Sequence, residues 1–232
     1  MKIILTGATG RAGTEVLKHC IQHPSITSII VLTRRPLPLS PTSPSNPTSK
    51  VQTILATNND YLTYDTPEIL QATAGAEACI WALGDPWADP TTARTISFDY
   101  PLAAARVFSQ RYNKNTVDGG KKKFHFVYLS GGAVERDQSK KLWFLQEERK
   151  VRGQAELALL DLAKEHNAQR LAVYILKPGM FLRDRLVDSL VAKLVPSVRV
   201  DVLAKVLVET AVRGAEEDTL LNRTILEEGR KL

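Results

Sequence analysis

The sequence predicts an α/β protein with a doubly wound parallel sheet. Apolar strand patterns alternate with helical patterns along the chain, and most of these strand patterns are continuous apolar runs of the kind buried on both faces of a sheet. The first of them passes through glycines directly into a helical pattern. Its 232 residues suffice for one such domain and are short for two, so we expect a single domain over residues 1–232.

A glycine-rich turn joins the first strand to the first helix. The apolar run at 3–5 leads into Gly7, Gly10 and Gly13, and a helical pattern begins at Ala12. In a Rossmann turn the first glycine permits the bend, the second lets the backbone approach a pyrophosphate, and the third lets helix and strand pack closely. The phosphates then lie on free N–H groups at the helix N-terminus, next to Arg11.

This turn therefore predicts a dinucleotide site, the alternative being a glycine loop without a ligand. The expected contacts from this turn come from Gly7, Thr9, Gly10, Arg11, Ala12 and Gly13.

The end of the second strand indicates which dinucleotide is bound. The apolar run at 28–33 ends at Arg34 and Arg35, and no acidic residue lies between Glu15 and Asp60. Enzymes that use NAD place an acidic residue here on the ribose 2′-hydroxyl, whereas enzymes that use NADP place arginine near the 2′-phosphate. The pattern favours NADP(H), and the alternative is a pair of solvated surface arginines.

The remaining elements follow in order along the chain. Residues 36–50 hold five of the twelve prolines and many Ser and Thr, so we expect an exposed or mobile loop inserted between two strands. The cap and proline at Thr66 and Pro67 predict a helix start. Further strands are expected at 51–55, 76–83, 124–129 and 171–176, and helices at 91–111, 141–166 and 202–212. Residues 178–232 are expected to form a small cap on the substrate side.

Composition limits the classes of partner. The formal net charge is +6, but the basic residues are dispersed and no basic arm or stripe is present, so nucleic-acid binding is not expected. Cys20 and Cys79 occupy apolar positions without metal-ligand spacing and are expected to be buried free thiols in a reducing compartment. No apolar run reaches the roughly 20 residues of a membrane span. We expect a cytoplasmic protein, a monomer or homodimer, with a small-molecule substrate and no metal.

The glycine turn, in the form TGxxGxxG from Thr6 to Gly13, resembles the short-chain dehydrogenase/reductase family, particularly its extended and atypical branches. Four later segments, at 79–84, 126–133, 152–160 and 177–185, look like the Tat-interacting-protein-like branch of atypical members. The resemblance covers most of the chain apart from the proline-rich insertion. It implies that Leu83, Gly84 and Lys177 lie against the cofactor. An acid at the place of Asp60 commonly contacts the adenine amino group in this fold, and capping of a turn is the equal alternative.

The resemblance also implies a catalytic arrangement, and this chain departs from it. Ser130 stands where redox members carry a serine that hydrogen-bonds the substrate oxygen. Those members also need a Tyr and, four residues later, a Lys that lowers the phenol pKa and makes the Tyr a general acid. None of the six tyrosines here is followed by Lys at that spacing. The family frame anchored on Gly153 puts Glu148 in place of the Tyr and Arg152 in place of the Lys.

Glu148 and Arg152 therefore carry either a modified catalytic role or an ordinary ion pair on an amphipathic helix. Tyr128 is expected to pack in the sheet and His125 to be structural. Three functions follow: an NADPH-dependent oxidoreductase for a small organic carbonyl compound, which is preferred; a non-redox isomerase, cyclase or dehydratase; and a non-catalytic NADPH sensor or partner protein. A role in small-molecule secondary metabolism rests on the resemblance alone.

Overall fold

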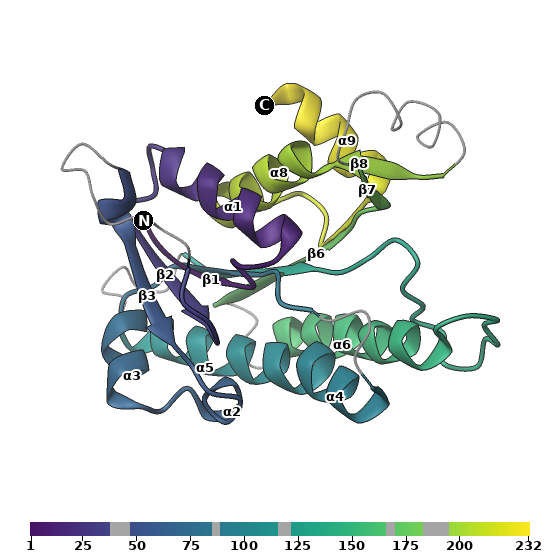
Figure 1. Ribbon diagram of the computed structural model, residues 1–232, viewed down its shortest axis with the longest axis horizontal. Coiled ribbons are helices and arrows are strands. Elements are labelled where there is room, and N and C mark those ends of the chain that lie inside the picture. The colour runs from purple at the N-terminus through teal and green to yellow at the C-terminus, as the bar shows by residue number, and fades with distance from the viewer. Residues whose placement is uncertain (38–46, 85–88, 116–121, 166–169, 183–194) are drawn as a thin grey trace.

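The computed structural model describes residues 1–37, 47–84, 89–115, 122–165, 170–182 and 195–232. A parallel seven-stranded sheet in the order β3-β2-β1-β4-β5-β6-β9 forms its centre (Figure 1). Its strands are β1 (Lys2–Thr6), β2 (Ser28–Thr33), β3 (Val51–Leu55), β4 (Ala78–Trp81), β5 (Phe124–Leu129), β6 (Leu171–Lys177) and β9 (Thr219–Leu221). A second, two-stranded sheet pairs β7 (Met180–Leu182) with β8 (Ser197–Arg199). This confirms the predicted doubly wound parallel sheet.

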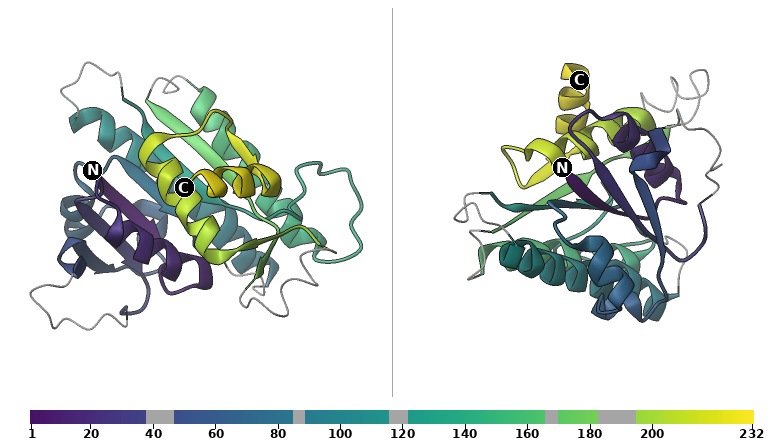
Figure 2. Two further views of the ribbon diagram at one scale, coloured as in Figure 1. Left: turned by 90° about the horizontal axis from the view of Figure 1, so that it is seen from above. Right: turned by 90° about the vertical axis from the view of Figure 1, so that its left-hand side faces the viewer.

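Helices cover both faces of the sheet, as Figures 1 and 2 show. One face carries α1 (Arg11–Gln22), α8 (Val200–Arg213) and α9 (Asn222–Lys231). The other carries α2 (Asp60–Thr63), α3 (Pro67–Thr73), α4 (Pro90–Arg94), the π-helical segment η2 (Thr95–Asp99), α5 (Tyr100–Asn115) and α6 (Gln146–Lys164). Successive strand residues point to opposite faces, so Ile3 packs under α1 and α8 while Ile4 packs toward α3 and α5. This explains the continuous apolar runs.

The predicted helix starts need two corrections. The pattern expected as one helix over 91–111 is three consecutive segments, since α4 passes through the π-helical η2 into α5. The helix expected from residue 141 begins only at Gln146, because Leu145 adopts a left-handed conformation with φ 46°. Trp143 therefore precedes the helix and is 92% exposed. The start at Pro67, capped by Thr66 Oγ1, is as predicted.

The C-terminal region is only partly the cap that we expected. Helix α8 packs beside α1 in the apolar layer over the sheet, and β9 adds a strand next to β6 (Figure 2). Thr219–Leu221 spans three residues, which is too short for a periodic signal. The parts of this region that line a cavity at the carboxyl end of the sheet are β7, the residues just before β8, the end of β9 and one side of α9.

Two further expectations concern loops and membranes. Most of the proline-rich insertion, 38–46, lies outside the described residues, and its end, Pro47–Lys50, is the short 3₁₀ helix η1. Because β3 pairs directly with β2, the insertion lies between neighbouring strands of one sheet and divides no domains. Among the helices in the described ranges, none has the length and apolar character needed to cross a membrane.

Candidate functional site

The three glycines of the first turn have distinct local surroundings. A Cβ at Gly7, which has φ +72°, would lie 2.3 Å from Ala82 O, and one at Gly13 would lie 2.0 Å from Gly7 O. A Cβ at Gly10 would meet only Gly7 O, at 3.2 Å. Gly7 and Gly13 are therefore required by the packing of the turn, whereas a Cβ at Gly10 would make a tight contact that a shift of a few tenths of an ångström relieves. This is the arrangement in which the middle glycine admits a pyrophosphate.

The N-terminus of α1 is free to receive an anion. No side chain caps it, its first turn holds no acidic residue, and Gly10 N is already used in a 2.9 Å hydrogen bond to Gly7 O. The next N–H groups have no intrahelical partners because they begin the helix. Gly10, Arg11 and Ala12 line a cavity. The residues present fit a dinucleotide phosphate, and its binding here stays a prediction.

One cavity of about 1430 Å³ extends from this helix across the carboxyl end of the sheet. Single-ligand sites measure roughly 300–1,000 Å³, so this volume accommodates a dinucleotide together with a second molecule. The cavity brings together the following predicted site residues: Gly10, Arg11, Ala12, Leu83, Gly84, Ser130, Arg152 and Lys177.

Ser130 is hydrogen-bonded to an acid that the sequence analysis did not single out. Its Oγ donates a short hydrogen bond to Glu156 Oε1, and Glu156 has no exposed surface. Lys177 Nζ donates to both oxygens of Glu156 at 2.9 Å and to Val134 O at 3.1 Å. Arg136 Nε contacts Glu156 Oε2 at 2.5 Å. Ser130, Glu156, Lys177 and Arg136, here called the Glu156 cluster, link β5, α6 and β6 beneath the cavity.

The sequence feature that could have identified Glu156 is its position on α6 relative to Glu148 and Arg152. Glu148, Arg152 and Glu156 are spaced four apart and therefore lie along one face of the helix. Gly153 allows this face to approach its neighbours, because a Cβ there would lie 1.8 Å from Glu135 O. The acid that meets Ser130 is thus two turns beyond Glu148. An isolated acid within the apolar stretch 155–160 is the pattern that predicts such burial.

Arg152 contributes a fixed cation to the cavity. Its Nη2 lies 3.1 Å from Glu148 Oε1, which is the predicted pairing across one helical turn. The two side chains are only 17% and 15% exposed, so the pair is more buried than a solvated surface pair. The guanidinium also lies over Gly84, where a Cβ would be 3.3 Å from Nη2. Its buried Nε has no hydrogen-bond partner among the described residues.

Three residues predicted for the adenosine end do not line this cavity. Arg34 and Arg35 are exposed directly after β2, and Arg34 Nη1 lies 3.4 Å from Asn58 Oδ1. Asp60 Oδ2 accepts hydrogen bonds from Thr57 N at 2.6 Å and Thr57 Oγ1 at 2.9 Å, so its carboxylate caps a turn. All three follow β2 or β3 at the carboxyl edge, where the adenosine part of a dinucleotide binds in this fold.

Other candidate groups have structural contacts. Tyr128 OH donates to Ser97 O at 3.1 Å, and burial raises the pKa of Tyr128 well above its ordinary range. His125 Nδ1 contacts Ala211 O at 3.0 Å. Cys20 and Cys79 are buried free thiols, and burial raises the pKa of Cys20 to about 12. In the part of the chain that the structure describes, no group of His, Cys, Asp and Glu is arranged to hold a metal ion.

Comparison with known sequences finds one curated relative. No protein-family model matches the chain. Leucinostatins biosynthesis cluster protein T from Purpureocillium lilacinum is 34% identical over 132 residues, which is 56% of this chain and 42% of that protein. The chain therefore matches less than half the length of this relative.

Comparison with solved structures addresses the fold. A short-chain dehydrogenase/reductase from Saccharomyces cerevisiae has a TM-score of 0.66 with 11% identity, covering 95% of both chains. The oxidoreductase ylbE from Lactococcus lactis has a TM-score of 0.64 with 17% identity, covering 100% of this chain and 98% of that one. The resemblance to the Tat-interacting-protein-like branch stays a prediction. The chain has the Rossmann fold of the short-chain dehydrogenases and reductases.

Proposed function

We propose that this protein binds NADP(H) and reduces a small organic carbonyl compound. The observation that carries the proposal is the single cavity that joins the uncapped N-terminus of α1 to Ser130 and Arg152. The solved structures with this fold include an NADH-dependent reductase with bound NAD, and the curated relative is named for a biosynthesis cluster. These similarities support a reductase of secondary metabolism. Arg34 and Arg35 support NADP(H) over NAD(H).

Bound NADPH would supply the hydride, and the chain's own residues would position the carbonyl oxygen and provide its proton. Arg152, held by Glu148, lines the cavity, and its guanidinium would bind that oxygen or the cofactor ribose. Ser130 lines the same cavity, and its hydroxyl donates a hydrogen bond to Glu156 Oε1. We expect the Ser130 hydroxyl to turn and give this proton to the oxygen.

The Glu156 cluster contains a route by which Ser130 regains its proton. Lys177 Nζ and Ser130 Oγ both donate to Glu156 Oε1, so this carboxylate oxygen connects the ammonium to the serine. A proton can move from Lys177 Nζ through Glu156 Oε1 to Ser130 Oγ, and solvent then reprotonates Lys177. This route replaces the missing tyrosine and makes Lys177 a proton donor instead of a cofactor contact.

The first test is cofactor binding. Titration with NADPH and NADH, followed by cofactor fluorescence, should give saturable binding with NADPH tighter by at least about ten-fold, or about 1.4 kcal/mol. Absence of saturable NADPH binding would refute the proposal, and tighter NADH binding would refute the role of Arg34 and Arg35.

The second test is turnover. NADPH oxidation is followed over a panel of aldehydes and ketones with the wild type, Ser130→Ala and Ser130→Thr. If Ser130 passes the proton, the Ala variant should lose about 10²–10⁴-fold in kcat while NADPH binding is unchanged, and Thr should recover part of the rate. Binding of NADPH without oxidation of any carbonyl compound would instead support the sensor alternative.

A further inference from the structure

Exposed apolar side chains concentrate at one place in this protein. Eleven large hydrophobic side chains are exposed among the described residues, and five of these line the cavity of the candidate site. Exposed apolar side chains scattered singly need no explanation, whereas a cluster of them marks a binding surface. We call these five the apolar wall: Phe144, Leu145, Met180, Val195 and Leu221.

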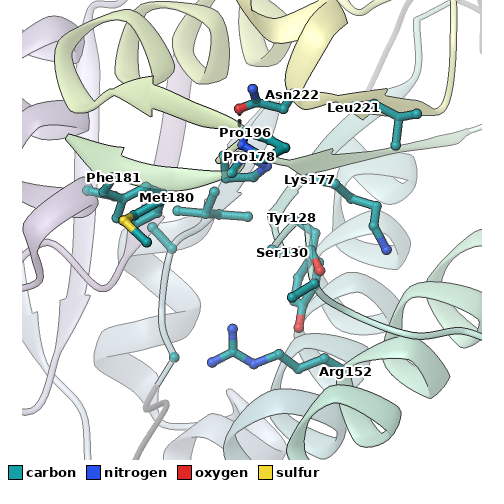
Figure 3. Close-up of a pocket in the computed structure, with 18 of the residues that line it drawn as sticks. Tyr128, Ser130, Arg152, Lys177, Pro178, Met180, Phe181, Pro196, Leu221 and Asn222 are labelled. Carbon is teal, nitrogen blue, oxygen red and sulfur yellow. Dashed lines mark hydrogen bonds between the residues drawn. The ribbon is translucent and has the colours of Figure 1, made fainter. Parts of the chain in front are cut away.

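The apolar wall is assembled from separate parts of the chain. Phe144 and Leu145 precede α6, Met180 begins β7, Val195 precedes β8, and Leu221 ends β9. Figure 3 shows Met180, Phe181, Pro178, Pro196 and Leu221 along one side of the cavity and Arg152 on the opposite side. The side opposite Arg152 thus carries these apolar residues together with Asn222 and Lys177, and Ser130 lies between Arg152 and this side in this view.

Several polar groups next to the apolar wall are bonded within the protein. Asn222 Oδ1 accepts from Gly179 N at 2.8 Å, and Asn222 Nδ2 donates to Ser197 O at 3.2 Å. Arg223 Nε pairs with Glu227 Oε1 at 2.8 Å. Hydroxyl groups of a sugar placed against the five side chains of the apolar wall would have no partners there, which costs free energy. An aliphatic chain has no hydrogen bonds to lose there, and its transfer from water to the apolar wall is favourable.

We infer that the second ligand of the cavity is a carbonyl compound with an apolar aliphatic chain. Its chain lies along the apolar wall, and its carbonyl oxygen points to the side of Ser130 and Arg152. The carbonyl group of this ligand is inferred from the proposed function. Its apolar chain is inferred from the apolar wall alone. Along the apolar wall, an aliphatic chain should therefore bind more tightly than a nucleotide sugar or another polar substrate.

The test separates apolar binding from turnover. Straight-chain aldehydes from butanal to decanal compete with N-phenyl-1-naphthylamine, a neutral fluorescent probe of apolar sites, with and without NADPH. Affinity should rise by up to about four-fold for each added CH₂ group, which corresponds to about 0.8 kcal/mol, until the wall is covered. Glyceraldehyde, a polar aldehyde, should compete at least about ten-fold more weakly than pentanal.

Two matched variants test whether decanal binds along the apolar wall. Leu221→Asp should weaken decanal binding by at least about ten-fold, since it puts a charge where the chain packs. Leu55→Asp is the control, because Leu55 also ends a strand at the carboxyl edge and is similarly exposed, 58% against 56%, but does not line the cavity. This control should bind decanal as the wild type does. Met180→Asp is a second wall variant should Leu221→Asp fail to fold.

The outcomes distinguish this inference from the proposed function. If affinity does not depend on chain length, or glyceraldehyde binds as well as pentanal, the inference is overturned, even where NADPH binds and is oxidised. An equal loss of decanal binding in Leu221→Asp and Leu55→Asp overturns it too. If the aldehydes bind along the wall but NADPH does not bind, the apolar site is supported and the proposed function is refuted.

Discussion

At the scale of single residues, two glycines of the turn have different roles: Gly13 is needed for packing, and Gly10 is predicted to admit the cofactor. Gly13 has no room for a side chain because Gly7 O occupies that space, whereas a Cβ at Gly10 would lie 3.2 Å from Gly7 O, a tight contact that a small shift relieves. Gly10 also has an ordinary extended backbone, with φ −85° and ψ 169°, which alanine adopts without strain. The two glycines should therefore respond differently to the same substitution.

We predict that Gly10→Ala leaves the fold intact but removes cofactor binding. The added methyl group would occupy the approach to the pyrophosphate, so NADPH affinity should fall at least about ten-fold, with a stability loss of only about 0.5 kcal/mol from the weaker helix cap. Gly13→Ala is the comparison variant and should lose about 1–3 kcal/mol or more, since the backbone must move. Urea unfolding and NADPH titration measure both, and unchanged NADPH affinity in Gly10→Ala would contradict the assignment.

The Glu156 cluster gives a second prediction at this scale. Glu156→Gln would leave the Lys177 ammonium, whose side chain is 10% exposed, without a counter-charge. Breaking a buried ion pair from one side costs about 3–5 kcal/mol, so the free energy of unfolding in urea should fall by about this amount. The double variant Glu156→Gln/Lys177→Met should be more stable than Glu156→Gln alone, because it removes the uncompensated charge.

A surface ion pair is the control for this prediction. Glu228 pairs with Lys231 at 2.6 Å on exposed side chains at the C-terminal end of α9, and Glu228→Gln should leave the unfolding midpoint unchanged. A Glu156→Gln protein as stable as the wild type would show that the cluster does not hold β5, α6 and β6 together.

At the scale of elements, α1 and α8 enclose a histidine whose protonation opposes folding. His19 lies in the last turn of α1, and its Nε2 is buried without a hydrogen-bond partner among the described residues. Burial is the main cause that lowers the pKa of His19, and Lys205 and Lys18 lower it further, while Glu15 and Asp201 raise it. The folded protein therefore binds this proton less readily than the unfolded chain.

The sign of the resulting pH dependence follows from linkage. The unfolded histidine has a pKa near 6.5, so between that value and the lower folded pKa the unfolded state holds more protons, and stability falls as the pH falls. We predict a lower urea midpoint at about pH 5 than at about pH 7.5 for the wild type. His19→Gln should show a smaller difference between the two conditions, and an identical pH dependence in both proteins would contradict the prediction.

At the scale of the whole molecule, the strand order brings distant segments to one edge. The carboxyl ends of β1, β4, β5 and β6 border the cavity, whereas Arg34 and Arg35 follow β2 at the adjoining part of the same edge. A dinucleotide that spans these strands would link the N-terminal and C-terminal halves of the sheet. Its binding should therefore stabilise the entire domain against unfolding.

We predict that NADPH at about 100 times its Kd raises the free energy of unfolding by about 2.7 kcal/mol. For a domain of this size the corresponding rise in Tm is about 5–10 °C, measured by differential scanning calorimetry. NADH at the same concentration should give a smaller rise. In Arg34→Ser/Arg35→Ser the two cofactors should become equivalent, and a wild type that responds equally to both would contradict the NADP(H) assignment.

The sequence by itself determined the layered α/β fold, the glycine turn and the predicted pairing of Glu148 with Arg152. These features are local, because apolar periodicity, glycine spacing and a four-residue helical separation are all contained in short windows. Only the tertiary structure decided that Ser130 meets Glu156, that Thr219–Leu221 joins the sheet and that five apolar residues from separate segments form one wall. These contacts join residues far apart in the chain, and their partners are selected by how the packed layers bring the segments together.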